Sequence, residues 1–182
     1  MLIEDRSMMD YFKFYEIPVS FSPDMTEIRR KYLVNSKQYH PDFFTQESES
    51  RQDEILKLSS LNNEAYKVLS DEDLRMKYIL ESEKILTEEN KNDIPQDFLM
   101  DMMDFNEKLM ELEFDFSPEI LEESKNELQQ IENQLRNEVA SILKKKTITE
   151  ASEEELLEVK NYYLKKRYLL RISEKLATFA SR

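Results

Sequence analysis

The sequence predicts an all-α protein in two parts. The first part is an antiparallel helical hairpin with short helices beside it, and the second is a C-terminal three-helix bundle. Three observations support this. Glycine, which tight hairpins and many β-bulges need at positive φ, is absent from all 182 residues. Strong helix formers are abundant. Apolar residues recur at intervals of three and four, as in helices with one buried face.

The composition excludes several classes of site. Cysteine is absent and histidine occurs once, so disulfides, thiol nucleophiles and sites built from cysteines or several histidines are excluded. Glycine-rich phosphate loops are also missing. A carboxylate-only magnesium or calcium site stays open, although no EF-hand loop is visible. We therefore expect a protein without a cofactor or a resident metal.

The charge and the ends of the chain bear on partners and location. A net charge of −13 disfavours nucleic acid and anionic membranes as partners. No apolar run approaches transmembrane length, and residues 1–10 resemble neither a signal peptide nor a transit peptide. We therefore expect a cytoplasmic protein.

The N-terminal part begins with a short aromatic helix, residues 10–17, that ends before a proline. After a loop, Asp24 has the signature of an N-cap and Glu27 that of its capping-box partner. The helix that follows should run to about residue 39. Its expected buried face consists of Met25, Ile28, Tyr32 and Tyr39. Its expected outer face is basic and carries Arg29, Arg30, Lys31 and Lys37.

The stretch Gln38–Phe43 organises this part of the chain, because it holds the single histidine. Pro41 has no backbone N–H and disfavours helical φ and ψ in the residue before it, so the helix must end near His40. His40, Pro41 and Asp42 should then be presented in a loop. A cluster of surface charges is usually a solvated helix face, but this basic cluster leads directly into the loop. A binding face is therefore the alternative.

A polar loop, residues 43–50, should lead to a third helix at about 51–69. Its apolar stripe would contain Ile55, Leu58, Asn62, Ala65 and Leu69. Two helices joined in this way should pack as an antiparallel hairpin. A short fourth helix is expected at 74–85. The composition of residues 87–95 is that of a linker, which predicts domains at 8–86 and 96–182.

Three helices are expected beyond the linker, at about 96–113, from Ser117-Pro118 to about 146, and at 152–180. Serine N-caps mark the starts of the second and third. Each helix has an apolar stripe, so a three-helix bundle is the expected packing. The stripe of the second comprises Leu121, Leu128, Ile131, Leu135, Val139 and Ile142. The stripe of the third comprises Leu156, Val159, Tyr163, Leu170 and Leu176.

The first helix beyond the linker has more apolar residues than one buried stripe needs. The stripe itself is Phe98, Met102, Phe105, Leu109 and Leu112. Leu99, Met100 and Met103 fall outside it, among acidic residues. Methionine-rich apolar surface of this kind suits protein binding, but a bundle that covers the helix on two sides would also explain it. Spacing alone leaves the two explanations open.

Residues 10–80 resemble a J domain, the module that activates DnaK-type heat-shock ATPases. The resemblance rests on Tyr39–Asp42 after a basic helix and on Leu61–Asp71 about twenty residues later. The whole chain resembles the HscB family, the J-domain co-chaperones of iron–sulfur cluster assembly. Residues 9–12 are similar to the opening of that family, and the run Asp97–Met100 is similar to the start of its scaffold-binding helix.

The resemblance implies that the chain binds an IscU-type iron–sulfur scaffold and delivers it to a DnaK- or HscA-type chaperone. It would stimulate the ATPase of that chaperone during cluster transfer and protein maturation, without being an enzyme itself. His40, Pro41 and Asp42 would trigger hydrolysis, and Arg29, Arg30 and Lys37 would meet an acidic patch. The scaffold would contact Leu99, Met100, Met103, Asp104, Glu107, Glu111 and Tyr168. We expect a bacterial protein that is monomeric.

Two departures from the family pattern stand out. Asn35 replaces a leucine that packs in the core of many J domains, and Met103-Asp104 replaces a usual Leu-Glu pair.

Three other interpretations of the sequence stay open. An enzyme would use His40 and Asp42 as an acid–base pair, but residues two apart across a proline need not face one another. A J-domain protein with a different client and a helical adaptor outside the chaperones are the other two.

Overall fold

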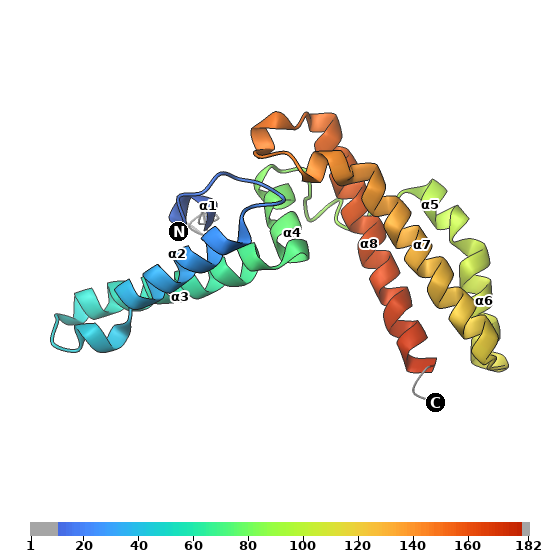
Figure 1. Cartoon of the computed structure of the whole chain (residues 1–182), viewed down its shortest axis with the longest axis horizontal. Helices are drawn as coiled ribbons and strands as arrows, with labels where there is room; N and C mark the ends of the chain where they lie inside the picture. The colour runs from blue at the N-terminus through green and yellow to red at the C-terminus, as the bar shows by residue number, and fades with distance from the viewer. Residues whose placement is uncertain (1–10, 180–182) are drawn as a thin grey trace. The chain divides into compact units, whose positions relative to one another are not determined.

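The structure is a computed structural model that describes residues 11–179. Over this range the chain is helical and contains no strand, which confirms the all-α prediction (Figure 1). The N-terminal helices are α1 (Tyr11–Phe14), α2 (Met25–Gln38), η1 (Pro41–Phe44), α3 (Glu49–Ser70) and α4 (Glu72–Ser82). The later ones are α5 (Gln96–Asp101), α6 (Met103–Phe114), α7 (Pro118–Leu143), η2 (Ile148–Glu150) and α8 (Glu153–Phe179).

The chain forms two compact units. The first comprises Met1–Glu83 with Lys144–Glu150, and the second comprises Lys84–Leu143 with Ala151–Arg182. The segment between α7 and α8 thus belongs to the first unit. There the Ile148 amide donates to the Val19 carbonyl (2.8 Å), and the Ser20 hydroxyl donates to the Lys145 carbonyl (3.2 Å). The domain boundaries drawn from the sequence stay a prediction.

Helix α2 begins and ends where the sequence predicts. The Asp24 carboxylate accepts a hydrogen bond from the Thr26 amide (2.8 Å) and caps the helix. Glu27 does not complete a capping box, because its carboxylate lies 3.6 Å from the guanidinium of Arg30. The predicted buried face is only partly right. Ile28 is fully buried, whereas Met25, in the first turn, is 43% exposed.

The predicted hairpin forms from α2 and α3, and a buried asparagine fixes it. The Asn62 side chain, 1% exposed, donates to the Tyr32 carbonyl (3.1 Å) and to the Ser36 hydroxyl (3.0 Å). Its Oδ1 accepts from the Tyr15 hydroxyl (3.0 Å). A buried amide is tolerated when its donors and acceptor are satisfied in this way. The Asn35 carbonyl accepts from the Tyr39 amide (2.8 Å), so α2 stays regular to its end.

The second unit contains a break that spacing did not predict. One helix was expected over residues 96–113, but it divides at Met102 into α5 and α6. Regular backbone bonds persist on both sides of the break, from the Met102 amide to the Phe98 carbonyl (3.1 Å) and from the Asn106 amide to the Met102 carbonyl (3.0 Å). The Asn106 side-chain amide donates to the same Met102 carbonyl (2.8 Å). The Met102 side chain is 1% exposed, so the break is anchored in the core.

Helices α6, α7 and α8 form the predicted bundle. The Ser117 hydroxyl accepts from the Ile120 amide at the start of α7 (3.3 Å). At the start of α8, Ser152 and Glu155 form the predicted capping box, with bonds of 2.7 and 3.2 Å. Helix α7 ends at Leu143, three residues earlier than expected. Leu170 is exposed, against expectation, because its buried neighbour Leu169 takes the core position.

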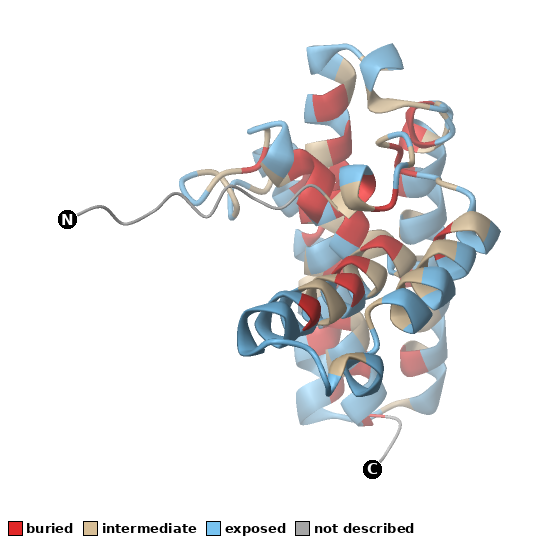
Figure 2. Ribbon diagram, turned by 90° about the vertical axis from the view of Figure 1, so that its left-hand side faces the viewer, coloured by how far each residue is buried: buried red, intermediate tan, exposed pale blue. Residues whose placement is uncertain are grey.

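Buried residues run as stripes along the helices, and the outer faces are exposed (Figure 2). The five residues predicted as the core stripe of α5 and α6 are all buried. No helix within residues 11–179 is long and apolar enough to cross a membrane.

Candidate functional site

The loop that follows α2 presents His40 and Asp42 at the tip of the hairpin (Figure 1). His40 is extended (φ −73°, ψ 120°), as expected for a residue before proline, and caps η1. Its Nδ1 accepts a hydrogen bond from the Asp42 amide (3.3 Å). An accepting Nδ1 carries a lone pair, so in this arrangement the ring proton sits on Nε2.

The two side chains of this loop that are predicted to bind a partner are exposed. The exposed fractions are 51% for the His40 side chain and 84% for the Asp42 side chain. The His40 ring also lies against the ring of Phe43, with centroids 5.3 Å apart. Phe43 is itself 68% exposed. The loop therefore offers an imidazole, a carboxylate and an aromatic ring on one small surface.

His40 and Asp42 lie close to each other, which their spacing alone does not require. Nδ1 lies 3.8 Å from Oδ2, beyond hydrogen-bond distance, because the Asp42 amide already occupies Nδ1. Within the described chain, no other side chain hydrogen bonds to either group. The third, orienting group of a catalytic constellation is thus lacking among residues 11–179. Over the same residues, no group of three or more His, Cys, Asp or Glu could hold a metal ion.

The basic face of α2 consists of three of the four expected bases. Arg29, Arg30 and Lys37 are exposed on the helix. The Lys31 ammonium instead turns back to the Glu16 carboxylate, 2.7 Å away, and is largely covered. This hydrogen bond, more than the charge of Lys31 alone, lowers the pKa of Glu16. Lys31 is therefore committed to a contact inside the first unit.

The apolar surplus of the second unit is exposed, which rules out the explanation that the bundle covers it. Leu99, Met100 and Met103 are 36%, 69% and 58% exposed. The bundle therefore does not cover this helix on two sides. The acidic residues that accompany them, Asp104, Glu107 and Glu111, are also exposed.

Tyr168 on α8 is packed rather than free. Its hydroxyl accepts a hydrogen bond from the Asn106 side chain on α6 (2.7 Å). Its ring packs edge-on against the buried Phe98 of α5, with centroids 5.7 Å apart. The residue is half-buried, so part of its ring stays at the surface. Tyr168 thus joins α8 to both helices of the predicted scaffold face.

Sequence reasoning missed one buried charge in the first unit. Arg75 is only 6% exposed, and its guanidinium donates to the carbonyls of Phe21 (3.0 Å) and Leu69. Burial lowers its pKa. Its position on α4 looks like that of any surface arginine, so no signal in the sequence distinguishes it. It holds the loop before α2 against the end of α3.

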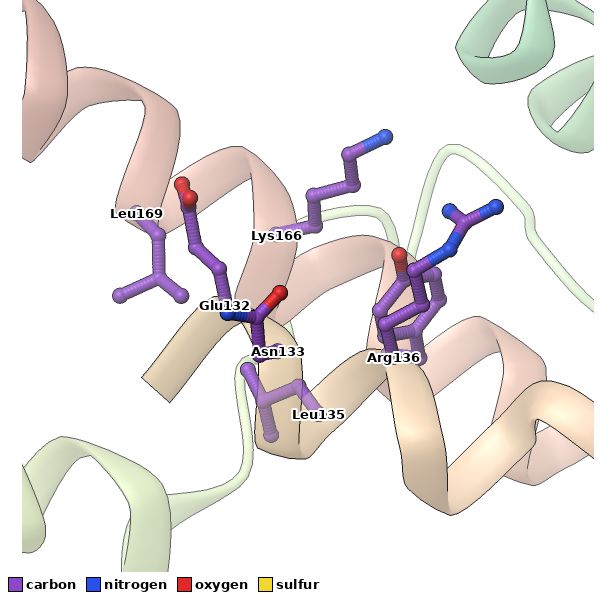
Figure 3. Close-up of a pocket in the computed structure, with 7 residues that line it drawn as sticks. Glu132, Asn133, Leu135, Arg136, Lys166 and Leu169 are labelled. Atoms are coloured by element: carbon purple, nitrogen blue, oxygen red, sulfur yellow. The ribbon is translucent and has the colours of Figure 1, made fainter. Parts of the chain in front are cut away.

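A cavity of about 210 Å³ lies in the groove between α7 and α8 (Figure 3). Acid, base, amide and apolar side chains all line it, and none is a predicted site residue. Its lining consists of Glu132, Asn133, Leu135, Arg136, Tyr162, Lys166 and Leu169. The mixed lining favours no particular ligand, and we assign the groove no role.

Two family models match the chain. The DnaJ domain matches residues 10–78, which include α2, the His40 loop and α3. The HSCB C-terminal oligomerisation domain matches residues 94–177, which include α5, α6, α7 and most of α8. Each model therefore covers one of the two candidate faces.

Relatives that carry the same name extend over both matches. The co-chaperone protein HscB homolog of Haemophilus ducreyi is 35% identical over 136 residues, which cover 70% of this chain and 78% of that protein. The human iron–sulfur cluster co-chaperone protein HscB is 30% identical over 168 residues. These cover 92% of this chain and 67% of that protein.

Solved structures support the same assignment. The crystal structure of human co-chaperone protein HscB matches with a TM-score of 0.71 at 27% identity, over 96% of this chain and 83% of that one. Chaperone HscB from Vibrio cholerae matches with a TM-score of 0.75, over 94% and 98% of the two chains. At 20% identity the latter match shows the fold alone. The helical units, the two family models and these relatives together show that the chain belongs to the HscB family of J-domain co-chaperones.

Proposed function

We propose that this protein binds an IscU-type iron–sulfur scaffold and delivers it to a DnaK- or HscA-type chaperone, whose ATPase it stimulates during cluster transfer. The observation that carries the proposal is the pair of exposed faces within one chain. One is a basic helix that ends in the His40 loop, and the other is apolar and acidic. The human relative is named an iron–sulfur cluster co-chaperone, and this name supports cluster transfer as the process.

The first face suits an ATPase partner. Arg29, Arg30 and Lys37 attract an acidic patch and speed the encounter. The exposed Asp42 carboxylate can then form a charge-assisted pair with an arginine of the partner. Pro41 limits the conformational freedom of the loop, so the loop loses less conformational entropy on binding. Hydrolysis takes place in the partner, whose conformational equilibrium this loop shifts.

The second face suits a protein client. Leu99, Met100 and Met103 are exposed apolar side chains that lose contact with water on binding. Methionine adapts to an irregular partner surface. Asp104, Glu107 and Glu111 can pair with bases at the rim, while Tyr168 contributes the exposed part of its ring. The protein would act as a monomer in the bacterial cytoplasm.

ATPase assays with the purified chaperone and the scaffold of the same organism test both faces. His40→Gln should abolish stimulation of hydrolysis and leave scaffold affinity unchanged. Leu99→Ala/Met103→Ala should weaken scaffold affinity about tenfold or more, because buried apolar anchors dominate interface energies, and keep basal stimulation. Asp53→Asn, an exposed carboxylate on α3, serves as the control. Full stimulation by His40→Gln would refute the J-domain role.

The same assays separate two other candidates. A J-domain protein with a different client would stimulate the ATPase but would not bind the scaffold. A helical adaptor outside the chaperones would do neither.

A further inference from the structure

We infer that the scaffold contact continues along α6 to its C-terminal end, through an outer stripe formed by Met103, Glu107, Met110 and Phe114. The inference rests on the proposed function and adds two large apolar residues, Met110 and Phe114, to its binding face. Neither Met110 nor Phe114 is among the residues predicted from the sequence to contact the scaffold.

The geometry of α6 puts these residues on one line. They follow each other at intervals of four, three and four, so they share one face of the helix. Phe105, Leu109 and Leu112 fill the opposite face and point into the core. The stripe is about 16 Å long at a rise of 1.5 Å per residue. Helix α6 is therefore apolar on two opposite sides.

Exposure separates the two sides sharply. The three core residues of α6 are at most 2% exposed, whereas Met103, Met110 and Phe114 are 58%, 55% and 88% exposed. Phe116, just past the helix, is 43% exposed and extends the apolar surface. Single exposed apolar residues are ordinary, but a contiguous line of large ones indicates an interaction surface.

The charges beside the stripe select the kind of partner. Asp104 and Glu111 line one flank, and neither they nor Glu107 in the stripe itself form an ion pair within the described residues. On the other flank, Glu113 is neutralised by the Lys175 ammonium at 2.8 Å. The open charge next to the stripe is thus negative. A second copy of this chain, packed stripe to stripe, would bring these carboxylates together, and an anionic membrane would repel them.

A protein with apolar side chains rimmed by lysine or arginine fits this surface. The stripe is continuous with the proposed scaffold face, because Met103 belongs to both. A scaffold bound to Leu99 and Met103 would therefore also reach Met110, which lies about two helical turns beyond Met103 on the same face. The ring of Phe114 would supply a large anchor at the far end, the type of residue that dominates interface energies.

Titration calorimetry with the full chain and the metal-free IscU-type scaffold of the same organism tests this inference. Met110→Ala/Phe114→Ala should raise the Kd about tenfold, as expected for loss of two apolar anchors. Leu157→Ala/Leu170→Ala is the matched control. It removes two apolar side chains of α8 that are 40% and 53% exposed, and it should leave the Kd unchanged.

Comparison with Leu99→Ala/Met103→Ala separates the two proposals. If that variant binds weakly and Met110→Ala/Phe114→Ala binds like wild type, the extension is wrong and the proposed function stands. If neither variant changes the Kd, the scaffold assignment fails, and the extension fails with it. Sedimentation of the free protein adds one more outcome. A dimer that Met110→Ala/Phe114→Ala dissociates would give the stripe to a second copy and overturn the inference.

Discussion

Helices α2 and α6 each have an exposed face for which we propose a partner, but different interactions hold the two helices in place. Helix α2 is held by hydrogen bonds from the buried Asn62, and its face carries guanidinium and ammonium groups. Helix α6 is held by Phe105, Leu109 and Leu112, and its face is apolar with an acidic flank. The difference indicates two kinds of binding. If the proposed function holds, charge would set the rate at which α2 associates with its partner, and burial of apolar surface would set the lifetime of the complex that α6 forms.

The largest expected effect concerns the polar support of α2. Asn62→Ala should lower the stability of the first unit by about 2–3 kcal/mol, because it removes the side-chain donor to the Tyr32 carbonyl and the Ser36 hydroxyl. The Tyr15 hydroxyl keeps its hydrogen bond to the backbone carbonyl of residue 62 (3.2 Å). ATPase stimulation should fall with it, while scaffold affinity should not change. Urea unfolding followed by NMR signals of α2 and α3 measures the loss.

Asn63→Ala is the matched control for that experiment. The Asn63 side chain accepts a hydrogen bond from the Tyr32 hydroxyl at an exposed site, so its loss should cost little. An equal loss of stability in the two variants would show that Asn62 is not the support of the hairpin.

A smaller effect is expected from the charge of α2. Arg29→Glu should slow association with the ATPase about tenfold at low salt, because electrostatic steering is lost. The difference from wild type should shrink as salt screens the charges. Stopped-flow measurements at several salt concentrations test this. Arg171→Glu, on α8, changes the net charge equally and should have little effect. A slowing that salt does not reduce would contradict the proposed role of charge.

The smallest effect concerns the ion pair that Lys31 makes inside the first unit. The hydrogen bond from Lys31 lowers the pKa of Glu16, so its carboxylate stabilises the folded state above the ordinary pKa of 4.5. That contribution is lost as the pH falls through the lower, folded-state pKa. Glu16→Gln should therefore be slightly less stable than wild type near neutral pH and equally stable in strong acid. The urea midpoint against pH measures this, and a constant difference would contradict it.

Much of the fold was predictable because its causes are local. Pro41 ends α2 through its own covalent structure, so the position of the His40 loop follows from the sequence. The core stripe of α5 and α6 is right at every residue, since spacing sets which side of a helix is buried. The exposure of Leu99, Met100 and Met103 follows from the same spacing once the core side is known.

The missed features depend on partners that are distant in sequence or on single side chains. Lys31 was counted with the basic face, but folding brings it to Glu16 and takes it out of that face. The break at Met102 leaves the spacing of the buried residues unchanged, so the apolar periodicity does not reveal it. Asn62 was placed on an apolar stripe, and only the folded hairpin supplies the partners that let it be buried there.

The hydrogen bonds from the segment between α7 and α8 have a practical consequence for dissecting the protein. A fragment that ends at Glu83 contains the His40 loop but lacks Lys145 and Ile148. The Val19 carbonyl and the Ser20 hydroxyl, the latter on a residue that is 3% exposed, would then lose these partners. Because the first unit is discontinuous in sequence, truncation removes part of it. Point substitutions in the 182-residue chain therefore test the two proposed binding faces without removing part of this unit.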